Sequence, residues 1–151
     1  MNDIGTRPFA EEDLLGIAKS SFGPNVSVKW LKSLRSERFI AWVIYGQGTD
    51  DDLDPNAVVY AIASGTSLSD AWKRCAVSIL GSSDQSVNIS DAARIIGVRR
   101  MSIHLYVVSG KLVLIRRPVT GQVTSRAYNR YVTPISVYRI FAANETRRRT
   151  K

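Results

Sequence analysis

The chain has 151 residues, a length that fits one domain of ordinary size or two small ones and excludes a large multidomain enzyme. Hydrophobic residues make up 44% and charged residues 23%, which is the composition of a chain that folds rather than of a disordered one. The formal net charge is +8, and the single cysteine, Cys75, excludes an intramolecular disulfide and a zinc site built on several cysteines.

The charge is divided unequally along the chain. Residues 1–85 contain 8 Lys and Arg against 11 Asp and Glu, a net −3, whereas residues 86–151 contain 13 against 2, a net +11. A segment this basic is expected to bind a polyanion, either nucleic acid or an anionic membrane surface, or to present a solvated basic face.

The start of the chain predicts a cytoplasmic protein. No apolar run approaches the roughly 18 residues of a membrane span, and the polar residues 1–13 do not resemble a signal peptide. We therefore expect no membrane partner, and association with the nucleoid if the chain binds DNA.

Residues 1–85 are predicted to form a helical bundle that oligomerises or binds a protein partner. Apolar residues recur at helical spacing between Gly and Pro breaks, and Asp54 followed by Pro55 is typical of a helix start. Three tryptophans, Trp30, Trp42 and Trp72, are expected to be core or interface anchors, and Cys75 a small core residue. The predicted helices cover residues 9–22, 27–45, 55–64 and 67–81.

The linker between two domains is predicted at residues 81–86. This segment is small and polar, and it lies where the charge changes sign. It separates an oligomerisation domain at 1–85 from a second domain at 86–151, which ends in a basic tail.

Residues 88–112 have the pattern of two short helices joined by a tight turn. Ser90 is suited to cap the first helix, and Ala93 is small enough for a second helix to cross close by. Gly97, four residues later, is able to adopt the positive φ that the turn requires. Ile103 is expected to point into the core. This pattern is typical of a helix-turn-helix, whose second helix fits the major groove of DNA.

The same residues resemble a known family. The run from Ile89 to Leu112, with Ala-Ala-Arg-Ile-Ile-Gly-Val and a closing Ser-Gly-Lys-Leu, is similar to the winged helix-turn-helix of MerR and excisionase-like proteins. The resemblance covers about residues 87–143. The residues that follow fit it: alternating strands at 111–117 and 122–132 flank a turn, and Thr133-Pro134 opens a last helix. The fold class expected is therefore mainly α, a helical bundle followed by a winged helix-turn-helix with a two-stranded wing.

A sequence-specific duplex-DNA-binding protein is the predicted function, with helix 99–109 in the major groove and wing 112–132 on the backbone or minor groove. Arginine bonds guanine, Ser and His reach base edges, and Met or Leu contacts a thymine methyl. The predicted DNA-binding residues are Arg99, Arg100, Met101, Ser102, His104 and Leu105 on the helix, Arg116, Arg117, Arg126 and Arg130 on or beside the wing, and Arg147, Arg148 and Arg149 in the tail.

Several roles remain open at this point. A transcriptional regulator of bacterial or mobile-element type is favoured, with a homodimer or higher homo-oligomer formed through residues 1–85. An excisionase-like architectural factor, a small terminase and a plasmid-segregation protein are alternatives that also bind DNA. A protein-interaction adaptor, in which Leu105 and Val108 pack on a partner, is the alternative of a different class.

No enzymatic activity, cofactor or metal site is expected. His104 is the only histidine and belongs to the predicted groove-facing helix, which leaves no residue for a Ser-His-Asp arrangement. The glycines match neither a phosphate-binding loop nor a dinucleotide fingerprint.

Overall fold

The structure is a computed structural model, and it describes residues 8–48, 53–81, 85–117 and 129–150. Within these ranges the chain forms five helices and two small antiparallel sheets. The fold is therefore mixed α/β. The helices fit the expected mainly α class, whereas the three-stranded sheet of residues 26–65 was not expected.

The larger sheet consists of β1 (Val26–Lys32), β2 (Phe39–Tyr45) and β3 (Val59–Gly65). The strands are antiparallel in the order β1-β2-β3, so β2 is central and both of its faces are buried. Successive side chains of β2 alternate between two hydrophobic cores, with Ile40, Trp42 and Ile44 on one face and Ala41 and Val43 on the other.

Two predicted helices of the N-terminal region are wrong. Residues 27–45 form the β1–β2 hairpin, and the strand at 39–45 has a continuous apolar run because it is covered on both faces. Such a run has no period-2 alternation, so its spacing also fits a helix. The helix predicted over 55–64 is replaced by β3, and Asp54 Oδ1 accepts a hydrogen bond from Asn56 N at 2.9 Å in a turn instead of capping a helix. The region is not a helical bundle.

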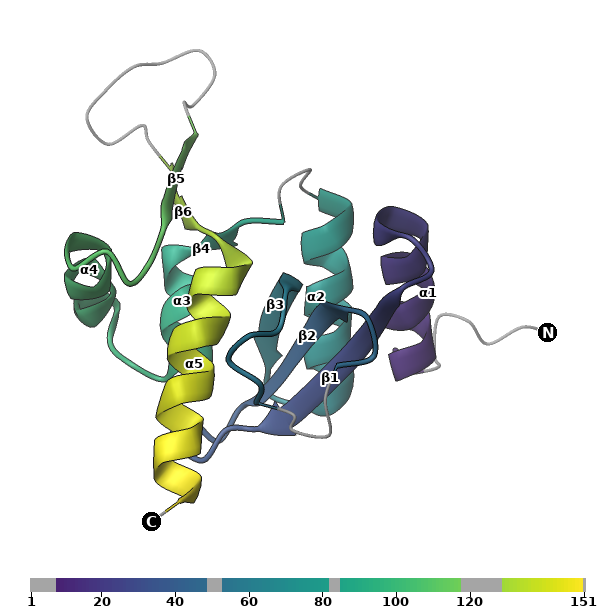
Figure 1. The fold of residues 1–151 in the computed structure, drawn as a ribbon, viewed down its shortest axis with the longest axis horizontal. Helices are drawn as coiled ribbons and strands as arrows, with labels where there is room; N and C mark the ends of the chain where they lie inside the picture. The colour runs from purple at the N-terminus through teal and green to yellow at the C-terminus, as the bar shows by residue number, and fades with distance from the viewer. Residues whose placement is uncertain (1–7, 49–52, 82–84, 118–128, 151) are drawn as a thin grey trace.

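One face of the sheet is covered by α1 (Glu11–Phe22) and α2 (Leu68–Gly81), as Figure 1 shows. Both helices confirm the predictions for 9–22 and 67–81. Leu14 of α1 and Cys75 of α2 are fully buried in this core. Strand β3 and α2 approach so closely that a Cβ atom on Gly65 would lie 2.4 Å from the backbone nitrogen of Ala71. The sheet and α2 are therefore joined by backbone packing as well as by side chains.

The other face of the sheet is covered by α5 (Pro134–Arg149), which confirms the predicted last helix (Figure 1). Its N-cap is Thr133, as expected from the Thr-Pro pair. The Trp42 ring lies 5.4 Å from the Tyr138 ring and 5.7 Å from the Phe141 ring, measured between centroids. Trp42 is thus the core anchor that was predicted, whereas Trp30 is 40% exposed on β1.

A helix pair and a small second sheet complete the fold. The helices are α3 (Ile89–Ile96) and α4 (Arg100–Val108), at the positions predicted. The second sheet has the order β4-β6-β5, made from β4 (Val87–Asn88), β5 (Leu114–Arg117) and β6 (Asn129–Val132). The predicted turn at 118–121 and most of the predicted returning strand lie outside the described residues.

The two regions on either side of residues 81–86 share a core. One hydrophobic cluster contains Trp42 and Ile62 from the first region together with Ile95, Ile103 and Phe141 from the second. The change of charge at 81–86 is therefore not accompanied by a division of this core. Among the described helices, none is long and apolar enough to cross a membrane.

Candidate nucleic-acid interface

The turn between α3 and α4 depends on Gly97. This residue has φ 81° and ψ 39°, in the left-handed region, and its N–H donates to Ala93 O at 2.8 Å. The predicted need for glycine at this turn is thus met. The predicted Ser90 cap is wrong: α3 begins at Ile89, two residues earlier than a Ser90 cap implies, so the cap is Asn88 and Ser90 lies in the first turn.

The loop between β1 and β2 braces this turn from the first region. Arg35 Nε donates to Gly97 O at 2.7 Å, and a Cβ atom on Gly97 would lie 3.0 Å from Arg35 Cγ. The loop is fixed in turn by Glu145 of α5, a side chain with 1% exposure. Its Oε1 accepts from Leu34 N at 2.7 Å and its Oε2 from Ser33 Oγ at 3.2 Å. The position of the helix pair therefore depends on residues of both regions.

Helix α4 has one face in the core and one face in solvent. Ile103 is fully buried, as predicted, and Tyr106 and Val107 are partly buried against the same core. Arg99 is the N-cap residue, but its side chain makes no capping hydrogen bond. Of the residues predicted to contact DNA, Arg99, Arg100, Met101, His104 and Leu105 are exposed and Ser102 is half-buried.

An apolar stripe lies on the exposed face of α4. Met101 is 84% exposed, Leu105 67% and Val108 71%. Their spacing of four and three residues places them on one face of the helix, so they form a continuous row. A row of exposed apolar side chains is typical of a contact surface, either with a protein or with thymine methyl groups.

The predicted wing arginines lie on paired strands. Arg116 stands opposite Arg130 in the β5–β6 ladder, and Arg117 opposite Asn129. This backbone pairing brings three of the four predicted wing arginines together in one hairpin. Arg126 lies outside the described residues.

The predicted basic tail is instead helical. Arg147, Arg148 and Arg149 form the last turn of α5, because the buried Glu145 holds this part of the helix against the β1–β2 loop. Arg149 Nη2 donates to Lys32 O at 2.9 Å and lies 3.6 Å from Glu145 Oε1. Arg149 therefore has a structural role, although its side chain, like that of Arg148, is exposed to solvent.

No family model matches this chain. No curated protein and no solved structure matches it either. The function is therefore inferred from the residues and their geometry.

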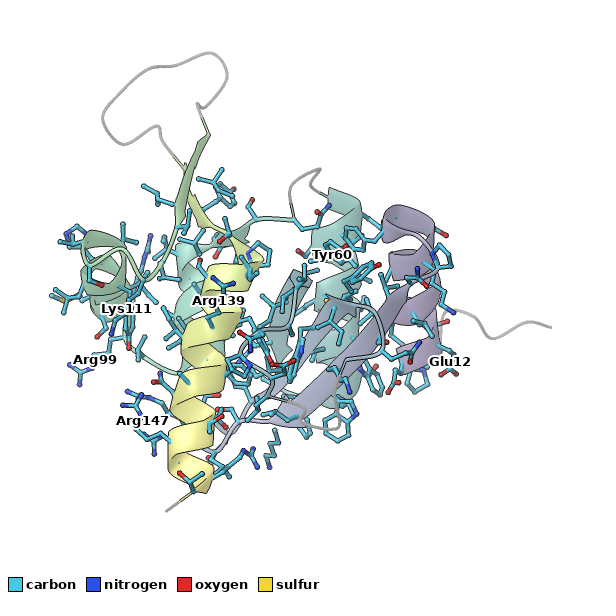
Figure 2. The ribbon with its side chains drawn as sticks, in the orientation of Figure 1. Glu12, Tyr60, Arg99, Lys111, Arg139 and Arg147 are labelled. Carbon is cyan, nitrogen blue, oxygen red and sulfur yellow. The ribbon has the colours of Figure 1, made fainter. Side chains whose placement is uncertain are left out.

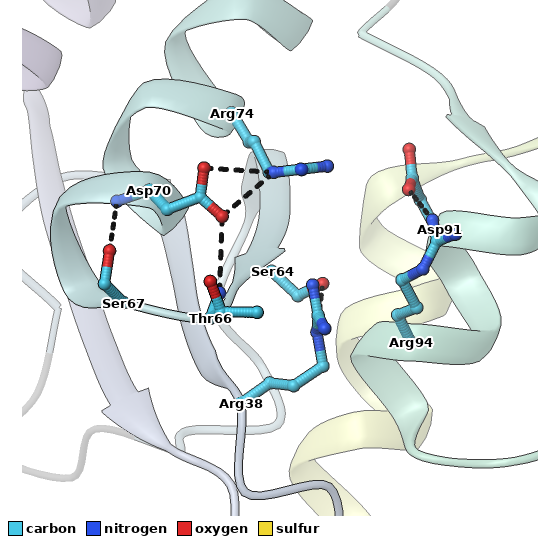
Figure 3. A network of polar contacts seen from close by, with 8 residues as sticks. All are labelled: Arg38, Ser64, Thr66, Ser67, Asp70, Arg74, Asp91 and Arg94. Carbon is cyan, nitrogen blue, oxygen red and sulfur yellow. Dashed lines mark hydrogen bonds and ion pairs between the residues drawn. The ribbon is translucent and has the colours of Figure 1, made fainter.

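Some arginines outside α4 are paired with carboxylates. Figure 3 shows Arg74 Nε between the two carboxylate oxygens of Asp70, at 3.2 and 3.1 Å, and Arg94 bonded to Asp91 at 2.8 Å. In the same network Arg38 Nε donates to Ser64 Oγ at 3.2 Å. This arrangement contrasts with the arginines of α4, which have no acidic neighbour in the first turn of that helix.

Three further cations were missed by the sequence analysis. Arg35, Lys111 and Arg139 line a pocket beside α4, together with Arg147 and Arg148. No sequence pattern connects Arg35 with Arg139, because the pocket forms only when α5 packs against the β1–β2 loop. The net charge of +11 in residues 86–151 was the one indication of such a cluster.

Cys75 is confirmed as a core residue. Its side chain is fully buried in α2, and burial raises the pKa of its thiol from 9.0 to about 12. The thiolate is the nucleophilic form of cysteine, so this group is kept unreactive at neutral pH.

Proposed function

We propose that residues 87–150 form a winged helix-turn-helix unit, similar to that of MerR and excisionase-like proteins, and that the protein binds duplex DNA in a sequence-specific manner. In this proposal α4 enters the major groove, and the β5–β6 hairpin contacts the backbone or the minor groove. The base-contacting residues are Arg99, Arg100, Met101, Ser102, His104 and Leu105.

The observation that carries the proposal is the two-sided character of α4. The buried Ile103 attaches the helix to the core, and Met101 and Leu105 lie exposed on the opposite face. Arg99 and Arg100, at the N-terminal end of the helix, are also exposed. The N-terminal residues of a recognition helix are those that reach base edges in helix-turn-helix proteins. A guanidinium group is able to bond O6 and N7 of guanine together.

The distribution of charge supports the same function. The net +11 of residues 86–151 favours a polyanionic partner, and Arg116, Arg117 and Arg130 lie on the hairpin that follows α4. Contacts from such a hairpin to phosphates fix the orientation of the protein without selecting a sequence.

The cellular role proposed is that of a DNA-binding regulator of bacterial or mobile-element type. The first region supplies its oligomerisation surface: β1 is an edge strand of its sheet, and Trp30 and Leu34 at its end are 40% and 54% exposed. An edge strand with exposed apolar side chains nearby is suited to pairing with a second copy of the chain. A dimer built in this way requires two half-sites about one helical turn apart, or a multiple of that distance.

The test is a selection from genomic DNA. Full-length protein is incubated with fragmented DNA of its source at about 150 mM salt, a concentration at which contacts with phosphates alone lose much of their affinity. Sequencing of the retained fragments is expected to give a few sites with a shared motif. Retention without any motif, or no retention, would contradict sequence-specific binding.

A second candidate function is that of a protein-interaction adaptor. The specific observation in its favour is the exposed row of Met101, Leu105 and Val108 on α4. Val108→Lys separates the two functions, because Val108 is not among the proposed base contacts. An added cation there preserves or strengthens binding to DNA and removes an apolar contact with a protein. Undiminished retention of DNA fragments by this variant favours DNA binding.

A further inference from the structure

A basic pocket lies between α4, α5 and the β1–β2 loop. Its volume is about 800 Å³, within the range of pockets that hold small ligands. Figure 2 shows two of its cations, Lys111 and Arg147, on the side of α5 that faces α4. Five of the ten residues that line it are cationic, and among these lining residues none is acidic: Arg35, Lys111, Arg139, Arg147 and Arg148.

The positive charge of this pocket is not neutralised by neighbouring carboxylates. In the described parts of the chain, the side chains of Lys111, Arg139 and Arg148 form no hydrogen bond or ion pair. Arg35 and Arg147 donate only to neutral acceptors, Gly97 O and Asn144 Oδ1. Clustered cations repel one another, so an arrangement without counter-charges is suited to bind an anion.

The carboxylate of α5 that lies nearest in sequence is directed elsewhere. Glu145 accepts hydrogen bonds from Ser33 and Leu34, and its ion pair is with Arg149, which does not line the pocket. Arg74 and Arg94, by contrast, each have an aspartate within 3.2 Å (Figure 3). The cations of the pocket thus differ from Arg74 and Arg94, whose charge is neutralised by a neighbouring aspartate.

Asn144 provides an independent observation. The residue lines the pocket and is only 9% exposed. Its Oδ1 accepts from Arg147, but its Nδ2 has no hydrogen-bond partner among the described residues. An unsatisfied buried donor is costly, and an acceptor bound in the pocket, after a small rotation of the amide, is able to satisfy it.

We infer that this pocket is a binding site for phosphate groups. Arginine forks match phosphate oxygens in geometry, and five cations exceed what a single carboxylate ligand needs. Tyr106 and Ile140 add apolar surface to the same pocket, which suits a sugar or a base attached to the phosphates. The phosphates belong either to a free nucleotide or to a DNA backbone that passes α4; in the second case the inference rests on the proposed function.

The experiment uses full-length protein and two probes, adenosine triphosphate followed by calorimetry and a mixed-sequence DNA duplex followed by fluorescence anisotropy. The pocket variant is Arg139→Gln/Arg148→Gln, because both side chains are exposed and have no described partner, so that folding is preserved. The matched control is Arg74→Gln, an arginine on α2 outside the pocket. A thermal melt verifies that each variant is folded.

The expected result is that the pocket variant binds one probe about tenfold more weakly or worse, while the control binds as the unmodified protein does. Weaker binding of the triphosphate alone identifies a free nucleotide as the source. Weaker binding of the duplex, with the slope of log affinity against log salt reduced by about 1 to 2, identifies the DNA backbone. Unchanged affinity for both probes overturns the inference.

Two more variants separate this inference from the proposed function. Arg99→Gln/Arg100→Gln is expected to weaken binding of the duplex and to leave binding of the triphosphate unchanged. The affinity for the triphosphate therefore tests the pocket independently of DNA binding through α4. Asn144→Asp removes the spare donor and adds negative charge, while the carboxylate keeps an acceptor for Arg147. It is expected to weaken the same probe as the pocket variant, and an unchanged affinity contradicts the role of Asn144.

Discussion

The two regions of the molecule differ in the balance of their charges. In the first, Arg74 is paired with Asp70, and the sequence up to residue 85 has a net charge of −3. In the second, Arg99, Arg100, Arg139 and Arg148 are exposed, and the sequence from residue 86 has a net charge of +11. The two acids of residues 86–151, Asp91 and Glu145, pair with Arg94 and Arg149, so the cations of this region far outnumber its acids. The excess positive charge lies on the surface proposed to bind anions.

The two regions are stabilised by a common core. Trp42 of the sheet packs against Tyr138 and Phe141 of α5, and Glu145 of α5 fixes the loop that carries Arg35. Charge is thus divided between the regions, while the core is common to both. A variant that affects only the surface is expected to alter binding alone, and a variant in the common core is expected to unfold both regions.

The largest expected effect comes from Trp42→Ala. The fully buried indole joins the sheet to α5, so its removal is expected to lower the free energy of unfolding by about 3–5 kcal/mol. Urea denaturation followed by circular dichroism and by fluorescence of the remaining tryptophans measures this loss. Both probes are expected to report one transition.

Trp30→Ala is the matched control, because this ring is 40% exposed and lies 6.3 Å from Phe39. It is expected to cost much less than the Trp42 substitution. Two separate unfolding transitions in the unmodified protein would contradict a common core, since they would show that the two regions unfold independently.

Glu145→Ala tests the link between α5 and the β1–β2 loop. The substitution leaves Leu34 N without its acceptor, and the expected loss of stability is about 1–3 kcal/mol. Glu12→Ala, an exposed acid on α1, is the control and is expected to cost less than about 1 kcal/mol. Equal effects of the two substitutions in thermal denaturation would show that the buried carboxylate does not join the regions.

Gly97→Ala tests whether the turn before α4 requires glycine. The left-handed φ of 81° and the contact with Arg35 Cγ make the substitution unfavourable by about 1–2 kcal/mol. Gly16→Ala, in the middle of α1 with nothing within 4 Å of the new Cβ, is expected to stabilise by about 0.5–1 kcal/mol. The melting temperature is expected to fall for Gly97→Ala and to rise for Gly16→Ala. A change in the same direction for both variants contradicts the role given to Gly97.

The smallest expected effect concerns Cys75, which is not expected to react with a thiol reagent at pH 8 unless the chain is unfolded by urea. Burial raises the pKa of the folded thiol to about 12, so above pH 9.0 the unfolded chain releases a proton that the folded chain keeps. Stability is therefore lost as the pH rises through that range. Rapid labelling of the native protein would contradict the buried position.

The helices could be predicted where a local residue type determines the backbone. Gly23-Pro24 ends α1, Gly97 makes the turn before α4, and Thr133-Pro134 begins α5. Strands β2 and β3 could not be distinguished from helices, because β2 is covered on both faces and its burial depends on α2 and α5. Their β-branched and aromatic residues were the available indication of strands.

The candidate site could be predicted only along single elements. The exposed residues of α4 follow from the position of Ile103 in the helix, and the pairing of Arg116 with Arg130 follows from the hairpin. The basic pocket could not be predicted, because Arg35 and Arg139 come from distant parts of the sequence. The helical structure of Arg147–Arg149 could not be predicted either, because it depends on the burial of Glu145 against the β1–β2 loop.

The most direct test of DNA binding through α4 compares Arg99→Gln/Arg100→Gln with Arg74→Gln on a duplex recovered from the genomic selection. Anisotropy at about 150 mM salt is expected to show a loss of roughly thirtyfold or more for the α4 variant, since each of the two base contacts is worth about 1–3 kcal/mol. The Arg74 variant is expected to bind as the unmodified protein does. Equal affinity of all three proteins would show that α4 does not contact the DNA.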